Sequence, residues 1–385
     1  MTKPLKHRIA VSLFFYTCGT IFASWAARIP SVKDQFGLNE AELGATLFML
    51  PLGSLIALPV AGWAVSHFGS RTMLFLSTIG YASLLLLLGY CSTTFQLSAC
   101  LFAFGFFGDI VNIAVNTQAL MVQEEHYRKP LMSSFHGMWS LGALTGAFTG
   151  GLFMKAGAGL LGHFTVIAVI ILVLAVAFFF YLIPKDTPRQ QDQKLFALPD
   201  KSLLILSLIC LCCALCEGAM ADWSSLYYKQ VLQDVNSIST TGYTAFALLM
   251  AGGRLIGDRI AERFGYKGTL QMDSVLISAG LLLAILVQHP VAVIIGFGMV
   301  GLGVATIIPI VYSLAGKSKT MAPSVALAAV STLGFTGFLI GPPVIGFLAH
   351  EVSLRWALLL VVALAGMIGV LAAVNRESGS GNRQS

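Results

Sequence analysis

The sequence has little charge and few long polar segments. Only 10% of its 385 residues are Asp, Glu, Lys or Arg, whereas soluble domains usually carry about 25%. The chain therefore has too few polar residues to cover a surface in water, and 57% of its residues are hydrophobic. The formal net charge of +6 does not indicate nucleic-acid binding, because the basic residues lie in short gaps between apolar runs. A lipid bilayer is the expected environment.

Signatures of enzymes and metal proteins are also missing. The sequence contains no HExxH, GxSxG or Walker pattern, and its histidines and acids do not form a metal site at helical spacing. All seven cysteines lie in apolar segments, where they are expected to be small packing residues, including the CxxC of Cys213 and Cys216. We therefore expect no enzymatic activity, no metal and no organic cofactor.

Long apolar runs, in contrast, are abundant. A helix needs about 20 apolar residues to cross the hydrocarbon core of a membrane, and the hydropathy pattern predicts twelve such helices. Their predicted ranges are 9–27, 42–64, 72–91, 95–121, 132–154, 161–183, 202–227, 239–260, 269–288, 291–315, 323–349 and 354–374. The first run is interpreted as an uncleaved helix, because many further spans follow it. The predicted fold class is an all-α membrane protein with twelve transmembrane helices.

Lysine and arginine are distributed unevenly between the two sides of these helices. If the N-terminus lies in the cytoplasm, seventeen of the 23 fall in cytoplasmic segments and five in outer segments, and Arg254 lies within a span. Positive charge is enriched in cytoplasmic loops. The distribution therefore predicts that both termini are cytoplasmic.

The two halves of the chain resemble each other. The stretch "SWAARIPSVK" and the later "GWAVSHFGSR" correspond to "DWSSLYYKQ" and "DRIAERFGYK", at an offset of about 196 to 198 residues. Such a repeat indicates that six helices were duplicated in parallel orientation. The predicted divisions are an N-terminal six-helix half (1–183), a cytoplasmic linker (184–201), a C-terminal six-helix half (202–376) and a disordered tail (377–385).

Twelve spans, a six-plus-six duplication and the glycine-marked loop after the second span resemble the major facilitator superfamily. In the first copy of this loop Ser66 stands where the family has an acid, whereas the second copy keeps the acid as Glu262. The resemblance implies a gate on the cytoplasmic side, formed by Gly62, Gly69, Arg71, Glu262, Arg263 and Gly265.

Four shorter stretches resemble a bacterial branch near the fucose permeases and the rhizopine-locus membrane proteins. They read "ASWAARIP", "SSFHGMWSLG", "EGAMADWS" and "IGPPVIGFL". This resemblance implies a monomeric, multi-pass protein of the bacterial inner membrane that transports a small solute, often a sugar-like one. It also implies that the first, fourth, seventh and tenth helices line a central cavity.

Acidic residues lie in two of those helices. Asp109, Asn112 and Asn116 follow each other at spacings of three and four, so they share one face of the fourth helix. The seventh helix carries Glu217 and Asp222. A charged group at membrane depth costs about 2.5–3.5 kcal/mol, and such groups usually serve a function. We predict proton coupling by Glu217 and Asp109. The alternative for Asp109 is a structural role, in which the acid bonds to Asn112 and to a neighbouring helix.

Other polar and aromatic residues are candidates for binding the solute. Asp222 lies beside Trp223, which has the character of an interfacial tryptophan, and it is expected to be solvated, to pair with Arg28 at the outer rim or to contact substrate. His136 can titrate near neutral pH, and a local structural role is its alternative. The full set of predicted substrate contacts is Asn112, Asn116, Trp139, His136, Tyr16, Asp222, Trp25 and Arg28.

The predicted function is secondary active transport of a small polar solute, with a sugar-like compound as the candidate, by alternating access and coupled to a proton gradient as symport. The alternative within this class is a proton antiporter that exports drugs or metabolites, which Gly142, Gly146 and Gly150 of the fifth helix favour. A membrane sensor or lipid-handling protein and a membrane enzyme are the other classes. The expected partners are a small-molecule substrate, protons and the bilayer, and no nucleic acid.

Overall fold

The computed structural model describes residues 2–127, 131–184, 203–232, 239–315, 318 and 323–375. These residues are almost entirely helical, and no strand occurs within these ranges. Helices suit a bilayer because they satisfy their backbone hydrogen bonds internally. Apart from Pro184, the predicted linker lies outside the described residues, as does the predicted tail.

The first of two compact units holds the described residues 2–38 and 45–184. Residues 39–44 are grouped with the second unit. Helix α3 (Glu40–Leu47) therefore starts in the second unit and ends in the first. The other helices of the first unit are α1 (Lys3–Ala26), α2 (Ile29–Phe36), α4 (Met49–Phe68), α5 (Ser70–Leu88), α6 (Thr94–Val122), the π-helical turn η1 (Gln123–Tyr127), α7 (Met132–Lys155) and α8 (Leu160–Phe179).

The second unit holds residues 39–44 and the described residues from 203 to 375. Its helices are α9 (Leu204–Leu232), α10 (Thr241–Leu286), α11 (Pro290–Ala315), α12 (Pro323–Val352), α13 (Leu354–Ala357) and α14 (Leu359–Val374). Helix α10 contains a non-helical residue at Gly265, so it comprises two of the predicted spans, one before and one after this glycine.

Helices lie over each of the twelve predicted ranges. Ten of them are long and apolar enough to cross a membrane. The other two are α7 and the part of α10 before Gly265. The all-α membrane fold predicted from hydropathy is therefore confirmed.

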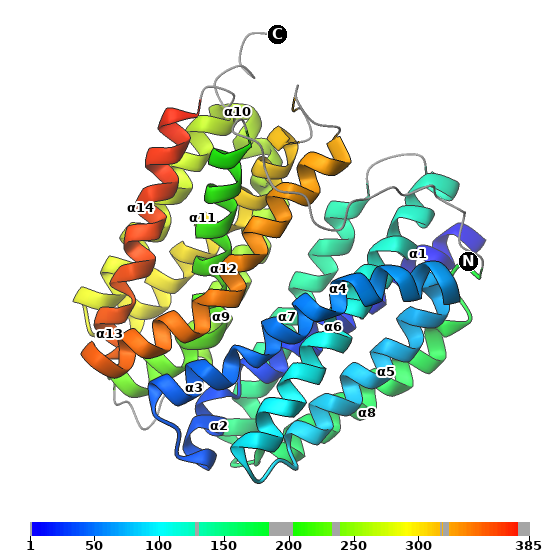
Figure 1. Ribbon diagram of the computed structural model, residues 1–385, viewed down its shortest axis with the longest axis horizontal. Coiled ribbons are helices and arrows are strands. Elements are labelled where there is room, and N and C mark those ends of the chain that lie inside the picture. The colour runs from blue at the N-terminus through cyan, green and yellow to red at the C-terminus, as the bar shows by residue number, and fades with distance from the viewer. Residues whose placement is uncertain are drawn as a thin grey trace. The chain divides into compact units, whose positions relative to one another are not determined.

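Each unit contains the same set of helix contacts. In the first, α1 contacts α7, α6 and α8, and α6 also contacts α4 and α5. In the second, α9 contacts α12, α11 and α14, and α11 contacts both parts of α10. Figure 1 shows the corresponding outer pairs, α5 beside α8 and α10 beside α14. The sequence repeat is therefore a repeat of structure, with six helices in each copy.

Small residues bring α1 and α7 unusually close together. A Cβ atom added at Gly146 would lie 2.5 Å from the Thr20 carbonyl oxygen and 2.8 Å from the Ser24 nitrogen. In the second unit, a Cβ atom at Gly337 of α12 would lie 3.0 Å from the Leu215 nitrogen of α9. Without a side chain at these positions, the helix backbones approach each other directly, as is common in membranes.

The glycine-marked loops of the two copies share one backbone conformation. Gly69, between α4 and α5, has φ 84° and ψ 145°. Gly265, its counterpart within α10, has φ 70° and ψ 163°. This region of conformational space is accessible almost only to glycine. The glycines predicted at the cytoplasmic gate therefore set the direction in which the chain enters the next helix.

Alanine at either position is expected to destabilise its unit. A Cβ atom makes this backbone conformation unfavourable by about 1–3 kcal/mol. Gly69→Ala and Gly265→Ala should each lower the thermal unfolding midpoint of the purified protein. Gly366→Ala in α14 is the matched control, because a Cβ atom there meets nothing within 4 Å. Equal midpoints for all three variants would contradict the assigned role of the two glycines.

Candidate functional site

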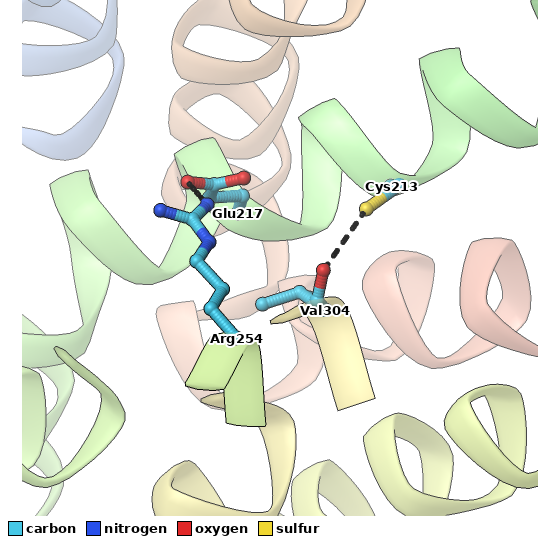
Figure 2. A network of polar contacts seen from close by, with 4 residues as sticks. All are labelled: Cys213, Glu217, Arg254 and Val304. Atoms are coloured by element: carbon cyan, nitrogen blue, oxygen red, sulfur yellow. Dashed lines mark hydrogen bonds and ion pairs between the residues drawn. The ribbon is translucent and has the colours of Figure 1, made fainter. Parts of the chain in front are cut away.

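The acid deepest in α9, Glu217, forms an ion pair. Its Oε1 atom lies 3.3 Å from Nη2 of Arg254, which belongs to the first part of α10. The side chain of Arg254 is 23% exposed and that of Glu217 is 15% exposed. Figure 2 shows the two side chains meeting between their helices. The pair places two opposite charges within predicted membrane spans, where neither would be stable alone.

Further polar groups surround this ion pair. One turn earlier on α9, the Cys213 thiol lies 3.9 Å from the Val304 carbonyl oxygen of α11 (Figure 2). Tyr243 of α10 and Tyr312 of α11 are both near enough to Glu217 to interact with it electrostatically. We call Glu217, Arg254, Tyr243 and Tyr312 the Glu217 cluster. It collects charged and hydroxyl groups from three helices of the second unit.

Asp222 lies five residues beyond Glu217 on the same helix. It is half-buried, and the described part of the chain gives it no hydrogen bond or ion pair. Tyr243 lies near enough to interact electrostatically with both acids. The predicted pairing of Asp222 with Arg28 would join the two units and stays a prediction.

Trp223 is not interfacial, and that interpretation is wrong. Its side chain is fully buried. The described part of α9 continues to Leu232 rather than ending near residue 227. Nine of its residues follow Trp223, about 13 Å of helix at 1.5 Å per residue, so the tryptophan does not lie at the end of the helix.

In the first unit, Asp109 of α6 lies close to α1 and α7. It is near enough to Cys18 of α1 to interact with it electrostatically, and Trp139 of α7 lies near the same thiol. The Oδ2 atom of Asp109 is buried and has no hydrogen-bond partner among the described residues. The proposed alternative, a structural bond to Asn112, is therefore not seen. The structure does bring two predicted site residues, Asp109 and Trp139, together around Cys18.

The two asparagines of α6 bond to each other. The Asn116 amide donates to the Asn112 carbonyl oxygen at 2.8 Å and to its side-chain oxygen at 3.0 Å. Their predicted position on one helix face is confirmed by these contacts. The Asn112 side chain is exposed, so its own amide hydrogens remain accessible from outside the helix bundle.

Two further predicted contacts lie along the α1–α7 interface. The Tyr16 hydroxyl donates to Thr145 Oγ1 at 3.1 Å. His136 is exposed, and its ring meets the ring of Phe15 edge-on with centroids 5.2 Å apart. These residues, like Trp139, present polar atoms attached to aromatic rings. Whether they contact a solute stays a prediction.

Trp25 and Arg28 are inside the first unit rather than at an open rim. They are only 1% and 3% exposed. The indole of Trp25 lies 6.5 Å from the ring of Phe104, and Arg28 donates to the Ala158 carbonyl oxygen at 2.8 Å. In this arrangement both side chains are covered by their own unit, so contact with a solute would require the helices around them to move.

The residues predicted to form the cytoplasmic gate differ between the copies. Arg71 lies over the ring of Phe179, 4.3 Å from its centroid, whereas Glu262 and Arg263 are exposed. Ser66, in the place of the missing acid, donates to the Trp63 carbonyl oxygen at 2.8 Å. In the first copy, the polar side chain at this position is therefore hydrogen-bonded within its own helix. The gating role of these residues stays a prediction.

Two buried polar residues were not identified from the sequence. Asp273, in the second part of α10, is 2% exposed and accepts a hydrogen bond from Thr306 of α11. Gln118 of α6 is fully buried. Its side-chain amide donates one hydrogen bond to Ser70 Oγ at 2.8 Å and another to the Ile183 carbonyl oxygen at 3.0 Å. An acid in an apolar run was the available signal for Asp273. Asp273 lies outside the helices that the family resemblance implies as the lining of a cavity, so that resemblance does not point to it.

Nothing in the described residues forms a metal centre: no group of three or more His, Cys, Asp or Glu side chains is suitably placed. All seven cysteines are free. The candidate residues of the two units are therefore acids, arginines, amides and aromatic rings that carry polar atoms, most of them on membrane-spanning helices. Duplicated six-helix units with such groups inside their spans define a class of membrane transport proteins.

The sequence profile of the Major Facilitator Superfamily matches residues 9–324, and the chain belongs to this family. It is 32% identical to the membrane protein MosC of Rhizobium meliloti, over 95% of this chain and 89% of that protein. It is also 32% identical to an uncharacterized MFS-type transporter of Yersinia pestis, over 92% and 91% of the two chains. The predicted family and branch are confirmed, and the protein is a transporter rather than an enzyme.

Its fold is similar to that of solved transporters. A D-xylose–proton symporter superposes with a TM-score of 0.78 over 97% of each chain, at 13% sequence identity. At this identity the likeness concerns the fold alone. It agrees with the helix order and duplication described above.

Proposed function

We propose that this transporter takes up a small polar, sugar-like solute by proton symport, with its two units giving access to each side of the membrane in turn. The observation that carries the proposal is the Glu217–Arg254 ion pair within the membrane spans. No resident cofactor is proposed, because the proton gradient supplies the energy. A monomer in the bacterial inner membrane, with cytoplasmic termini, is the proposed form.

A proton can break the Glu217–Arg254 pair. When Glu217 is ionised, its carboxylate balances the guanidinium at 3.3 Å. When Glu217 takes up a proton, the attraction is lost, and Arg254 becomes free to bond to other acceptors. The α9–α10 contact then has two states, and proton binding selects between them.

Asp109 supports a second proton position, in the first unit. Its buried Oδ2 atom has no donor among the described residues, and an ionised carboxylate without donors is unfavourable in an apolar environment. The protonated acid carries no charge. The first unit can therefore move Asp109 without carrying an unbalanced charge between environments.

The solute chemistry follows from the amides and aromatic rings of the first unit. Asn112 and Asn116 offer donors and acceptors to hydroxyl groups, and Trp139 and Tyr16 offer ring faces to the apolar side of a sugar. The structurally similar protein is named as a D-xylose–proton symporter. A pentose is therefore the first solute to test.

Uptake by reconstituted protein tests the proposal. Purified protein is placed in vesicles, and radiolabelled D-xylose, hexoses and polyols are supplied outside with an inward proton gradient. Accumulation above the external concentration is expected for at least one solute, and a protonophore should abolish it. Vesicles without protein are the control. Uptake that proceeds equally with and without the gradient would contradict proton coupling.

A further inference from the structure

The outer end of α1 contains a cluster of buried polar atoms that have no partners. Among the described residues, eleven buried side-chain nitrogen and oxygen atoms make no hydrogen bond, and five of them belong to Ser24, Arg28 and His163. Ser24 and His163 are fully buried, and Arg28 is 3% exposed. Unsatisfied polar atoms are rare in protein interiors. Their concentration in three residues therefore needs a physical reason.

These residues converge from two parts of the first unit. Ser24 lies in the last turn of α1, and Arg28 is the second residue after this helix ends at Ala26. Because Ala27 keeps helical backbone angles, the four-residue spacing brings Arg28 to about the same side of the chain as Ser24. His163 comes from the first turn of α8 and lies near enough to Arg28 to interact with it electrostatically. Arg28 is held in place by its bond to the Ala158 carbonyl oxygen, 2.8 Å away.

The surroundings of the cluster are closely packed and apolar. A Cβ atom added at Gly150 would lie 2.7 Å from Ala27 Cβ and 3.5 Å from His163 Cε1. The His163 ring also contacts Phe153, with centroids 4.9 Å apart. No acid among the described residues forms an ion pair with Arg28. The guanidinium is therefore a buried positive charge whose only hydrogen bond is to a neutral carbonyl group.

We infer that Ser24, Arg28 and His163 form a binding site for a small inorganic anion, for which chloride is the probe. The unpaired Nε and Nη1 groups of Arg28 are donors, and a hydroxyl group and an imidazole N–H can complete the set. An anion would balance the guanidinium charge, which a water molecule would not. The close packing around Gly150 and His163 disfavours a large organic anion.

Anion-dependent stability of the full-length protein tests this site. The purified protein is exchanged into gluconate salt, and chloride then replaces gluconate at constant ionic strength. A ligand that binds the folded state alone raises the thermal midpoint and then saturates. This behaviour is expected for the wild type. Arg28→Gln should lose the chloride dependence, and His163→Phe should raise the half-saturating chloride concentration several-fold while preserving the ring.

A matched control is Arg355→Gln in the second unit. Its guanidinium also donates to a backbone carbonyl, that of Ile285 at 2.9 Å, but the residue is half-buried and close to Trp356. This variant should keep the wild-type chloride response. Equal midpoints of the wild type in gluconate and chloride would overturn the inference. If Arg28→Gln does not fold, an unchanged chloride response in His163→Phe would overturn it. These measurements need no transport, so their outcome is independent of the proposed function.

Discussion

Uphill uptake is expected to disappear in Glu217→Gln and in Asp109→Asn. The amides keep the size of the acids but neither gain nor lose a proton, so the gradient can no longer drive accumulation. Solute levels in energised vesicles should fall to those measured with a protonophore. Exchange of labelled for unlabelled solute should remain, because it requires alternating access but no net proton movement.

Glu351→Gln is the matched control for these two variants. Glu351 is an exposed acid in the last turn of α12 and takes no part in the proposed site. It should accumulate solute as the wild type does. Full uphill activity in both Glu217→Gln and Asp109→Asn would remove these acids from the coupling mechanism. Loss of exchange as well would indicate damage to the fold or to solute binding.

Removing Arg254 alone is expected to destabilise the protein more than removing both partners of its ion pair. The Glu217 side chain is only 15% exposed. The substitution Arg254→Gln therefore leaves a largely buried carboxylate without its positively charged partner. Breaking a buried pair costs about 3–5 kcal/mol. The partial exposure of these side chains places the expected cost at or below about 3 kcal/mol. In the double variant Glu217→Gln/Arg254→Gln no charge remains, so part of this loss should be recovered.

Thermal unfolding of the two single variants and the double variant gives the coupling between the residues. Contacting residues usually couple by about 0.5–3 kcal/mol. Arg259→Gln is the control, because Arg259 is exposed on the same helix, α10. The coupling free energy between Arg259→Gln and Glu217→Gln should be no larger than the error of the measurement. Additive losses for Arg254 and Glu217 would show that the ion pair contributes nothing to stability.

Much of the fold was predictable from hydropathy and the internal repeat. A bilayer imposes a nearly fixed length on each apolar helix, so the twelve ranges follow from composition. The predicted break between 239–260 and 269–288 coincides with the non-helical backbone at Gly265. The burial of Trp223 was not predictable in this way. It depends on how α9 packs against α11, α12 and α14.

The candidate site was predictable only in part. An acid within a span is visible in the sequence because it interrupts an apolar run, which identified Asp109 and Glu217. Its partner is set by the packing of different helices. Arg254 was therefore placed within a span but not assigned to Glu217, and the bond between Asp273 and Thr306 was missed. The contact of Arg28 with Ala158 likewise joins positions 130 residues apart.

If Glu217 carries the coupling proton as proposed, its pair with Arg254 also sets how transport responds to the membrane voltage. With both side chains ionised, the pair has no net charge, and its energy depends little on the potential. A proton bound to Glu217 leaves the positive charge of Arg254 unbalanced within the spans. Moving one charge across the whole membrane is worth about 2.3 kcal/mol per 100 mV, and a movement of Arg254 across part of it is worth a fraction of that. A cell interior at negative voltage would then favour inward movement of the protonated transporter, so the electrical potential would assist the proton gradient.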